Sequence, residues 1–317
     1  GDRERPEHLG WTRLQRWVHR HSATLRYVVL PLLFLMLIGV ELRTSIGQSI
    51  LFSNWAETIH YEVERGPSSR IRFPEQGPYS RRLGYSRLPR MMDRLTERSY
   101  DVTAQAHMSL PMALTMDLGL YPPYRHKDQA GLEIRDHRGR DLFAAEYPRY
   151  AYADGDSIPD LVWRSLLFIE NRDLMDSTRV YANPAVEWDR FAVAALKRVA
   201  SGGGPGGSTL ATQLTKVRHS PGGRTHSVPE KFRQMMSASL LAYRDGMKTL
   251  EARRQIVTEY LNQLPLAAAP GHGEVYGIGD GLWAWYGREF DAVNDVLTRI
   301  PADSAITKEK LRRRAVA

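Results

Sequence analysis

The sequence predicts a mainly α-helical protein in which one transmembrane helix and a small α/β module precede a helical domain. Three observations support this class. An apolar run near the N-terminus is long enough to cross a bilayer, apolar residues recur at helical spacing after residue 157, and strand-like patterns occur before residue 150. We therefore divide the chain into a basic tail at 1–22, a transmembrane helix at 23–42, an extracytoplasmic module at 43–150, the helical domain at 151–300, and a C-terminal tail, or the start of a missing region, at 301–317.

The composition limits the classes of partner and of site. The 317 residues suffice for about two domains and include no cysteine, so neither a disulfide framework nor a thiolate zinc site is expected. The net charge of +8 favours acidic partners such as nucleic acid, anionic lipid or pyrophosphate. Nucleic acid is not expected, because no basic patch with interleaved aromatic residues occurs. His219 and His226 have no third ligand nearby in the sequence to complete a metal site.

The apolar run covers residues 28–40 and, with its weakly polar flanks, reaches the ~20 residues needed to cross a bilayer. The apolar run is preceded by Arg13, Arg16, Arg20 and Arg26, whereas far fewer basic residues follow it closely. The positive-inside rule therefore places the N-terminus in the cytoplasm and the residues after about 43 outside. A cleaved signal peptide is the alternative, but the basic lead is long and no small-x-small cleavage site is evident.

The segment between the apolar run and residue 150 carries mixed patterns. Residues 85–98 predict a helix whose apolar stripe packs in the core, formed by Leu88, Met91, Met92 and Leu95. Residues 100–106 predict a strand, and Pro111 and Pro122–Pro123 are expected to break the chain. Two short strand patterns around the turn residues 137–140 predict a β-hairpin.

A helical pattern begins after Ser157, which can cap a helix that has Pro159 in its first turn. One face of this helix is apolar and consists of Val162, Leu166 and Ile169. Glu170 follows at the end of the helix. A carboxylate beside apolar neighbours suits a general base, although a solvated charge at a helix end is the simpler interpretation.

The run Gly206–Lys216 starts with two glycines and two hydroxyl residues and continues as an amphipathic helix. Ser208 or Thr209 can cap this helix, and its free backbone N–H groups can bind an anion. Gln213 and Lys216 lie three residues apart, so they share a face and can reach one ligand. The alternative is a capped helix without a ligand.

The order of residues in this run resembles the GGST-x-x-QQL-x-K motif of the peptidoglycan glycosyltransferases, the transglycosylase domains of bifunctional penicillin-binding proteins. Gln213 matches the second glutamine, whereas Thr212 replaces the first and Val217 replaces the asparagine that usually follows. The resemblance continues in order from about Pro159 to Phe290. No transpeptidase motif follows, so penicillin binding is not expected.

Glu170 matches the catalytic glutamate of the family's first motif. Asn171 stands where the family has Asp, and Asn183 and Ala185 stand where it has His and Gly. In the third motif, Arg-Lys-x-x-Glu, Lys231 is retained. The flanking positions differ, because Glu230 replaces the arginine and Gln234 replaces the glutamate.

Glu230 also has a structural explanation, since Ser227 and Glu230 fit a capping box at the start of a helix. The apolar stripe of that helix is expected in the core and includes Phe232, Met235, Met236 and Leu240. The segment 254–262 resembles the family's I-L-E-x-Y-L-N helix, with Glu259 and Asn262 matching, and is expected to be architectural.

The resemblance implies a lysozyme-like glycosyltransferase domain that polymerises lipid II, with Glu170 as general base. It implies that Lys216 and Lys231 hold the pyrophosphate, and the other residues implied in substrate binding are Ser208, Thr209, Gln213, Asn171 and Gln234. Arg218, Arg224 and Arg233 lie close in sequence and are expected to add to the phosphate grip. A magnesium ion is compatible with the family, although Gln234 would weaken its binding because an amide is a poorer magnesium ligand than a carboxylate.

The same resemblance implies a single-pass protein of the bacterial inner membrane whose catalytic domain is periplasmic. Its partners would be lipid II or a similar polyprenyl-pyrophosphate glycan, the membrane, and cell-wall assembly proteins. Two alternatives remain open. One is a non-catalytic relative that acts as a scaffold or lipid-binding module, and the other is a glycosyltransferase for a different polyprenyl-linked saccharide.

Overall fold

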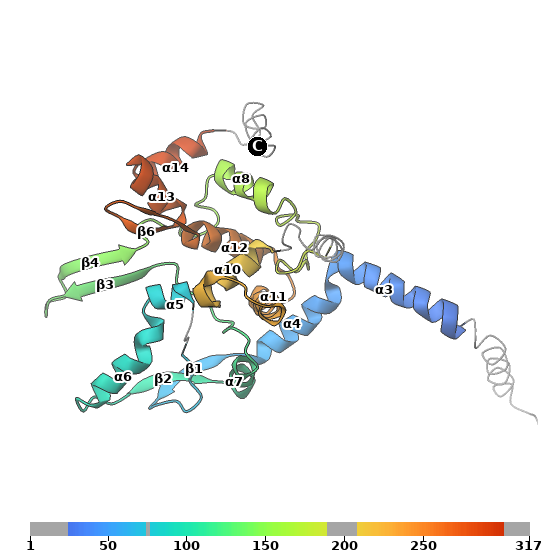
Figure 1. Ribbon diagram of the computed structural model, residues 1–317, viewed down its shortest axis with the longest axis horizontal. Coiled ribbons are helices and arrows are strands. Elements are labelled where there is room, and N and C mark those ends of the chain that lie inside the picture. The colour runs from blue at the N-terminus through green and yellow to red at the C-terminus, as the bar shows by residue number, and fades with distance from the viewer. Residues whose placement is uncertain (1–24, 74–76, 189–207, 301–317) are drawn as a thin grey trace, which may run out of the picture.

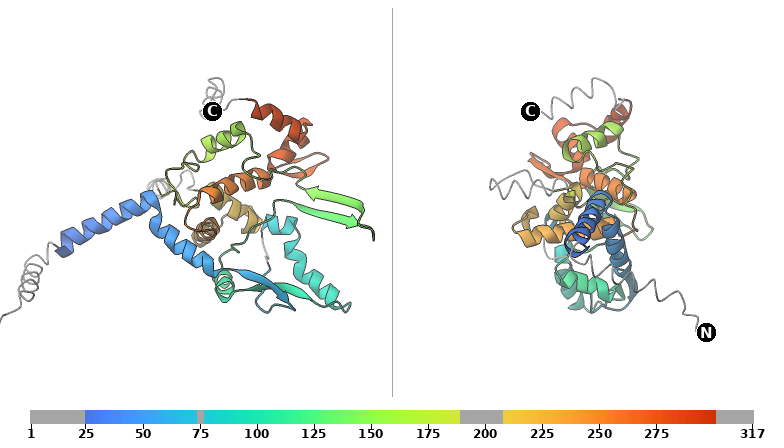
Figure 2. Two further views of the ribbon diagram at one scale, coloured as in Figure 1. Left: turned by 180° about the vertical axis from the view of Figure 1, so that it is seen from behind. Right: turned by 90° about the vertical axis from the view of Figure 1, so that its right-hand side faces the viewer.

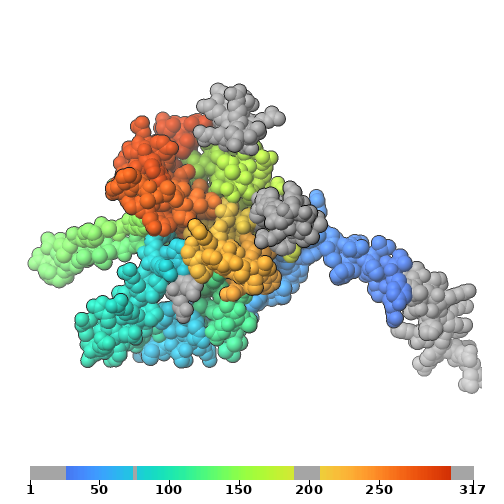
Figure 3. Space-filling model, viewed as in Figure 1, coloured from blue at the N-terminus to red at the C-terminus, as the bar shows by residue number. Residues whose placement is uncertain are grey.

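The computed structural model describes residues 25–73, 77–188 and 208–300. The expected basic tail with Arg13, Arg16 and Arg20, the glycines Gly206 and Gly207, and the C-terminal tail at 301–317 lie outside these residues. The described part is mainly helical and contains three two-stranded antiparallel sheets, which confirms the predicted class. A long helix projects from the rest of the molecule (Figures 1 and 3).

The projecting helix consists of η1 (Leu25–Val29) and α3 (Leu30–Thr44). Its stretch Arg26–Thr44 is the one helix among the described residues that is long and apolar enough to cross a membrane, and none of its side chains is buried. Pro31 lies in the first turn of α3, where the missing N–H costs little. Length and composition fit either a membrane anchor or a signal sequence.

A sharp bend connects α3 to α4 (Ile46–Thr58), as the left view in Figure 2 shows. Ser45 adopts a left-handed conformation at the bend, with φ of 56°. The Glu41 carboxylate accepts hydrogen bonds from the backbone N–H groups of Gly47 at 2.7 Å and Gln48 at 2.9 Å. A carboxylate at a helix N-terminus is stabilising, so Glu41 fixes the start of α4.

Helix α4 then packs directly against the helical domain. Phe52 of α4 stacks on Tyr243, at the end of α11 (Val228–Ala242), with ring centroids 5.9 Å apart. The side-chain amide of Asn183 also donates to Gln48 Oε1 at 2.9 Å. The apolar helix is therefore joined to the helical domain through α4.

The small module contains the antiparallel strands β1 (Tyr61–Arg65) and β2 (Ala104–Met108) and three helices. The helices are α5 (Pro78–Arg82), α6 (Leu88–Thr96), which follows the short η2 (Tyr85–Arg87), and α7 (Leu110–Asp117). The predicted strand at 100–106 therefore exists but begins at Ala104. Pro111 does not break the chain; it lies in the first turn of α7, and Ser109 caps that helix through Met112 N–H.

Helix α6 confirms the predicted helix but not its predicted burial. No residue of α6 is buried, and Met91 and Leu95 are 54% and 46% exposed. The spacing correctly indicated which side chains share a face. The expectation of a core position was wrong, because no residue of α6 is buried against another element.

The predicted hairpin is confirmed as β3 (Ala130–Arg135) and β4 (Asp141–Tyr147), which pair antiparallel. Asp136 closes the turn by accepting hydrogen bonds from the backbone N–H groups of Arg138 at 2.8 Å and Arg140 at 2.9 Å. The hairpin extends away from the other elements (Figure 1). Its strands are almost entirely exposed.

The helical domain is built around α8 (Asp160–Glu170), α10 (Leu210–His219), α11 and α12 (Leu250–Gln263). A short 3₁₀ turn, η3 (Pro221–Gly223), follows α10. After α12 the chain forms a hairpin of β5 (Pro265–Ala269) and β6 (Gly273–Tyr276) and then the helices α13 (Gly277–Tyr286) and α14 (Phe290–Thr298). One apolar core joins α8, α10 and α12 and includes Leu167, Leu210, Leu214, Val257 and Leu261.

Three local predictions in this domain were wrong. Ser157 does not cap α8, because its hydroxyl donates to the Asp154 carbonyl at 2.7 Å and closes the preceding turn. Ile169 and Phe232 were expected in apolar stripes, yet they are 66% and 61% exposed. Met236 and Leu240, in contrast, do pack in a second core cluster together with Phe52.

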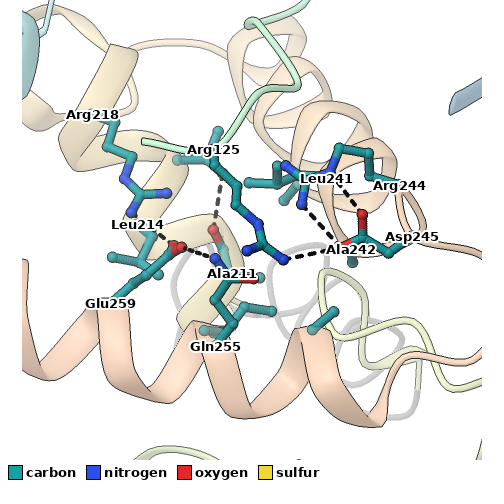
Figure 4. Close-up of a pocket in the computed structure, with 14 residues that line it drawn as sticks. Arg125, Ala211, Leu214, Arg218, Leu241, Ala242, Arg244, Asp245, Gln255 and Glu259 are labelled. Atoms are coloured by element: carbon teal, nitrogen blue, oxygen red, sulfur yellow. Dashed lines mark hydrogen bonds and ion pairs between the residues drawn. The ribbon is translucent and has the colours of Figure 1, made fainter. Parts of the chain in front are cut away.

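A buried ion pair connects α10 to α12. The Arg218 guanidinium lies 2.7 Å from Glu259 Oε2, and its Nε donates to Gln263 Oε1 at 2.9 Å. Gln255 donates to the second oxygen of Glu259 at 2.8 Å. Figure 4 shows Arg218 and Glu259 pointing toward each other beside a cavity of about 30 Å³, which has room for a water molecule or two but not for a sugar.

Arg218 therefore does not belong to the phosphate grip that its position in the sequence suggested. Residues two positions apart in an α-helix are separated by about 200° around the helix axis. Arg218 and Lys216 therefore occupy opposite sides of α10. The same geometry separates Arg233 from Lys231 on α11, and Arg233 lies near Gly119 of the small module. Arg224 is exposed after the end of α10.

The ion pair generates a stability prediction. Arg218→Met should lower the free energy of unfolding by about 3–5 kcal/mol, because Glu259 would remain buried without its counter-charge. The double change Arg218→Met/Glu259→Leu should recover much of this loss. Urea unfolding of the full chain in detergent, followed by circular dichroism, measures both. Arg72→Met is the control, since Arg72 forms a solvent-exposed pair with Asp117, and exposed ion pairs contribute little to stability. Equal losses for the two single variants would contradict the prediction.

Candidate active site

Glu170, at the last position of α8, is the first residue of a polar cluster. Gln213 on α10 donates from Nε2 to Glu170 Oε2 at 3.1 Å. The hydroxyl of Tyr260 on α12 donates in turn to Gln213 Oε1 at 3.2 Å. Three helices thus meet at one carboxylate, and the chain of hydrogen bonds holds it in one position.

Tyr260 determines the donor-to-acceptor direction of these hydrogen bonds. Burial and the nearby negative charge of Glu170 raise the pKa of Tyr260 to about 12, so its hydroxyl keeps its proton at neutral pH and can donate. Because the Gln213 oxygen receives that proton, the NH₂ group of the amide faces Glu170. Sequence reasoning expected the whole segment 254–262, which contains Tyr260, to be architectural. The signal that could have revealed it is its place beside Glu259 in the segment that resembles a family motif.

Two lysines lie on the adjacent faces of α10 and α11. Lys231 Nζ donates to Ser208 Oγ at 2.8 Å and lies 3.5 Å from Thr212 Oγ1. Burial, together with the positive charge of Lys216, lowers the pKa of Lys231 to about 8. Neither ammonium forms an ion pair with a carboxylate among residues 25–73, 77–188 and 208–300. Two cations held close together in this way favour a ligand with several negative charges.

The start of α10 lies beside these lysines. Thr209, rather than Ser208, is the N-cap, and it forms a capping box with Thr212. The Thr209 side chain accepts from Thr212 N–H, and Thr212 Oγ1 accepts from Thr209 N–H at 2.9 Å. Ser208 thereby remains available to contact Lys231. We call Glu170, Gln213, Tyr260, Ser208, Lys216 and Lys231 the Glu170 cluster.

The other predicted site residues lie elsewhere in the domain. Asn171 is buried directly after Glu170, at the C-cap of α8. Gln234 is fully buried, and its amide donates to Ser220 Oγ at 2.9 Å and to Thr225 Oγ1 at 3.0 Å. Its hydrogen bonds therefore join α11 to the chain that follows α10 rather than to the Glu170 cluster.

Ser227 and Glu230 only partly confirm the predicted capping box. Ser227 Oγ accepts from Glu230 N–H at 3.2 Å, as expected. Glu230 Oε2, however, accepts from the backbone N–H of His226 at 2.7 Å instead of that of Ser227. Glu230 thus stabilises the start of α11, which agrees with the structural explanation for this departure.

The residues around the cluster do not form a carboxylate-held metal site. No group of three or more His, Cys, Asp or Glu side chains in the described part of the chain is arranged to hold a metal ion. His219 does not approach His226 but contacts His126, with 3.2 Å between their Nε2 atoms. Burial and the charge of Arg218 lower the pKa of His219 to about 3. The amide of Gln234 is engaged by hydroxyl groups inside the fold, so it is not directed toward a cation beside the two lysines.

Comparison with known families agrees with this geometry. Residues 140–298 match the family model described as transglycosylase, and the match covers half of the chain. The chain therefore belongs to the transglycosylase family, and its helical domain has the lysozyme-like fold of the peptidoglycan glycosyltransferases. No curated protein matches the chain. The match begins in the turn of the β3–β4 hairpin and ends with α14, so it contains the whole Glu170 cluster.

The lowered pKa of Lys231 generates a binding prediction. Above pH 8 the free protein loses the Lys231 charge, whereas a bound polyanion raises the pKa and retains the proton. Affinity for inorganic pyrophosphate should therefore fall as pH rises from 8 to 10, by up to about tenfold per pH unit. Calorimetric titration of the full chain at pH 7, 8, 9 and 10 measures this.

Lys231→Arg is the matched control, because a guanidinium stays charged across this range. The fall in affinity that belongs to Lys231 should disappear in this variant, and any remaining slope reports the ionisation of pyrophosphate itself. The same slope in both proteins would show that Lys231 does not bind the anion.

Proposed function

We propose that this protein is a membrane-anchored glycosyltransferase that polymerises lipid II into peptidoglycan strands. The observation that supports this most is the hydrogen-bonded chain of Glu170, Gln213 and Tyr260 inside a transglycosylase domain whose helices α10 and α11 also carry two neighbouring lysines. A fixed carboxylate in a domain that also holds two neighbouring cations suits a reaction in which a hydroxyl is deprotonated and a pyrophosphate departs.

In the proposed reaction Glu170 accepts the proton of the acceptor sugar hydroxyl. The oxygen of that hydroxyl forms a bond with the anomeric carbon of the donor sugar. The bond between that carbon and the phosphate oxygen breaks, and its electron pair leaves with the polyprenyl pyrophosphate. Lys216 and Lys231 stabilise the charge on the leaving group, while Ser208, Thr209 and Gln213 orient the donor.

Asn171 and Gln234 belong to this proposal as supporting residues. Asn171 ends α8 and so fixes the place where Glu170 leaves the helix. Gln234 holds the chain after α10 through Ser220 and Thr225. Since Gln234 carries no charge and its amide is engaged by Ser220 and Thr225, it cannot serve as a magnesium ligand, and we expect a shallow dependence of activity on magnesium concentration.

A non-catalytic relative is the second candidate, and one observation favours it. Three positions at which the chain departs from the family are used in internal hydrogen bonds, namely Thr212, Asn183 and Gln234. Such bonds preserve the fold without requiring catalysis. A glycosyltransferase for another polyprenyl-linked saccharide is the third candidate, and it would retain the Glu170 chemistry with a different donor.

Glu170→Gln should reduce the polymerisation of labelled lipid II by about 100- to 10,000-fold, because the amide cannot accept the proton of the acceptor hydroxyl. The measurement is the rate of glycan strand formation by the full chain in detergent. The matched control is Glu97→Gln, which changes an exposed carboxylate of the small module. Near-normal turnover in Glu170→Gln would rule out its role as the base, and an inactive wild-type protein would favour the scaffold or another substrate.

The proposed anchoring predicts a topology. The 317-residue sequence contains no cysteine, so single cysteines can be introduced at Ser22 and at Thr96 and tested with a membrane-impermeant maleimide in intact spheroplasts. Thr96→Cys, in the exposed helix α6, should react, and Ser22→Cys should react only after the membrane is permeabilised. The reverse pattern would contradict the inferred orientation.

A further inference from the structure

A second pocket lies near the start of α8, apart from the Glu170 cluster. It has a volume of about 430 Å³, which is within the size range of small-molecule sites. Its apolar wall includes Ile158 and Val257, both buried, and the half-buried ring of Trp163. Polar side chains also line it, among them Asp156 and Arg254. We call it the Trp163 pocket.

The indole of Trp163 is held in place by its own helix. Its Nε1 donates to Asp160 Oδ1 at 3.1 Å, and the other oxygen of Asp160 lies 3.1 Å from the guanidinium of Arg164. That guanidinium also lies over the Trp163 ring, 5.2 Å from a ring centroid. A ring that is fixed before a ligand arrives loses little entropy on binding.

The lining of the Trp163 pocket suits a pyranose sugar. A pyranose has C–H groups that can pack on the electron-rich face of an indole, and a rim of hydroxyl groups that need hydrogen-bond partners. Asp156 and Asp160 supply acceptors for such hydroxyls, and Arg254 supplies donors. A phosphate is disfavoured, because two carboxylates line the pocket against the single guanidinium of Arg254, and a hydrocarbon chain would leave the polar side chains without partners.

The pocket and the Glu170 cluster lie along the same two helices. Trp163 and Glu170 are seven residues apart on α8, so they lie on one side of the helix, about 10 Å apart along its axis. On α12, Val257 lines the pocket and Tyr260, three residues later, belongs to the cluster. A polymer that extends from the reacting sugar along α8 and α12 would therefore reach the Trp163 pocket.

We propose that the Trp163 pocket binds a pyranose unit of the glycan strand, as a saccharide subsite separate from the reacting centre. This inference rests on the proposed function for the identity of the glycan. Occupation of the pocket keeps a strand attached between additions, so its loss should shorten the products more than it slows the first coupling.

The test uses chitotetraose, a lipid-free oligosaccharide of N-acetylglucosamine, and the full chain in detergent. Trp163→Ala should weaken binding by roughly tenfold in calorimetric titration, because the stacking surface is lost. Trp163→Phe should retain part of the affinity, since it keeps an aromatic face. Trp285→Ala is the matched control, because this 42% exposed indole lies outside the pocket and its loss should not change the affinity.

A further variant and a further ligand keep the result interpretable if Trp163→Ala folds poorly. Asp156→Ala changes an exposed residue of the pocket and should weaken binding by a smaller factor. Unchanged affinity in Trp163→Ala and Asp156→Ala, or binding of a peptidoglycan stem peptide in place of chitotetraose, would overturn the proposal.

Chitotetraose binding by Glu170→Gln separates this proposal from the proposed function. Binding that is retained in Glu170→Gln and lost in Trp163→Ala supports the subsite whether or not the wild type polymerises lipid II. If the wild type polymerises lipid II and Trp163→Ala gives strands of normal length, the subsite is refuted while the proposed function stands.

Discussion

The buried pairing of Arg218 with Glu259 is the constraint on which the rest of the domain depends. A guanidinium and a carboxylate inside a fold must satisfy each other, so the pairing holds α10 beside α12, and any shift that separated the two groups would leave a buried charge without a partner. The same two helices carry Gln213 and Tyr260, whose hydrogen bond leads to Glu170. An interaction on one side of α10 thus helps to place the side chains of the Glu170 cluster on its other side.

The positions that differ from the family share a physical explanation. Thr212 completes the cap of α10, and Asn183 joins its loop to α4 and α11 through Gln48 and Ser239. Gln234 bridges Ser220 and Thr225 without introducing a charge into a fully buried position. At each of these positions the residue present forms hydrogen bonds inside the fold, while Glu170, Lys216 and Lys231 match the family motifs.

The helices of the domain and the β3–β4 hairpin could be predicted because spacing and turn residues report local structure. Spacing does not reveal whether another element packs on the apolar face of a helix. The apolar stripe of α6 was therefore wrongly expected in the core, and Ile169 and Phe232 were wrongly expected to be buried. Sequence order grouped Arg218 with Lys216, although a two-residue step puts them on opposite sides of α10. The hydrogen bond of Tyr260 could not be predicted from the sequence, because Glu170, Gln213 and Tyr260 lie on three separate helices that meet only in the folded protein.

The bend at Ser45 has a mechanical consequence for a protein anchored as proposed. Glu41 binds the first N–H groups of α4, and α4, about 20 Å long, is packed against α11, so no flexible tether separates the anchor from the domain. The domain then cannot swing out to capture substrate from bulk solution. Encounters are confined to what diffuses laterally past the anchor, and the rate of collision would depend on the surface density of substrate in the bilayer rather than on its volume concentration.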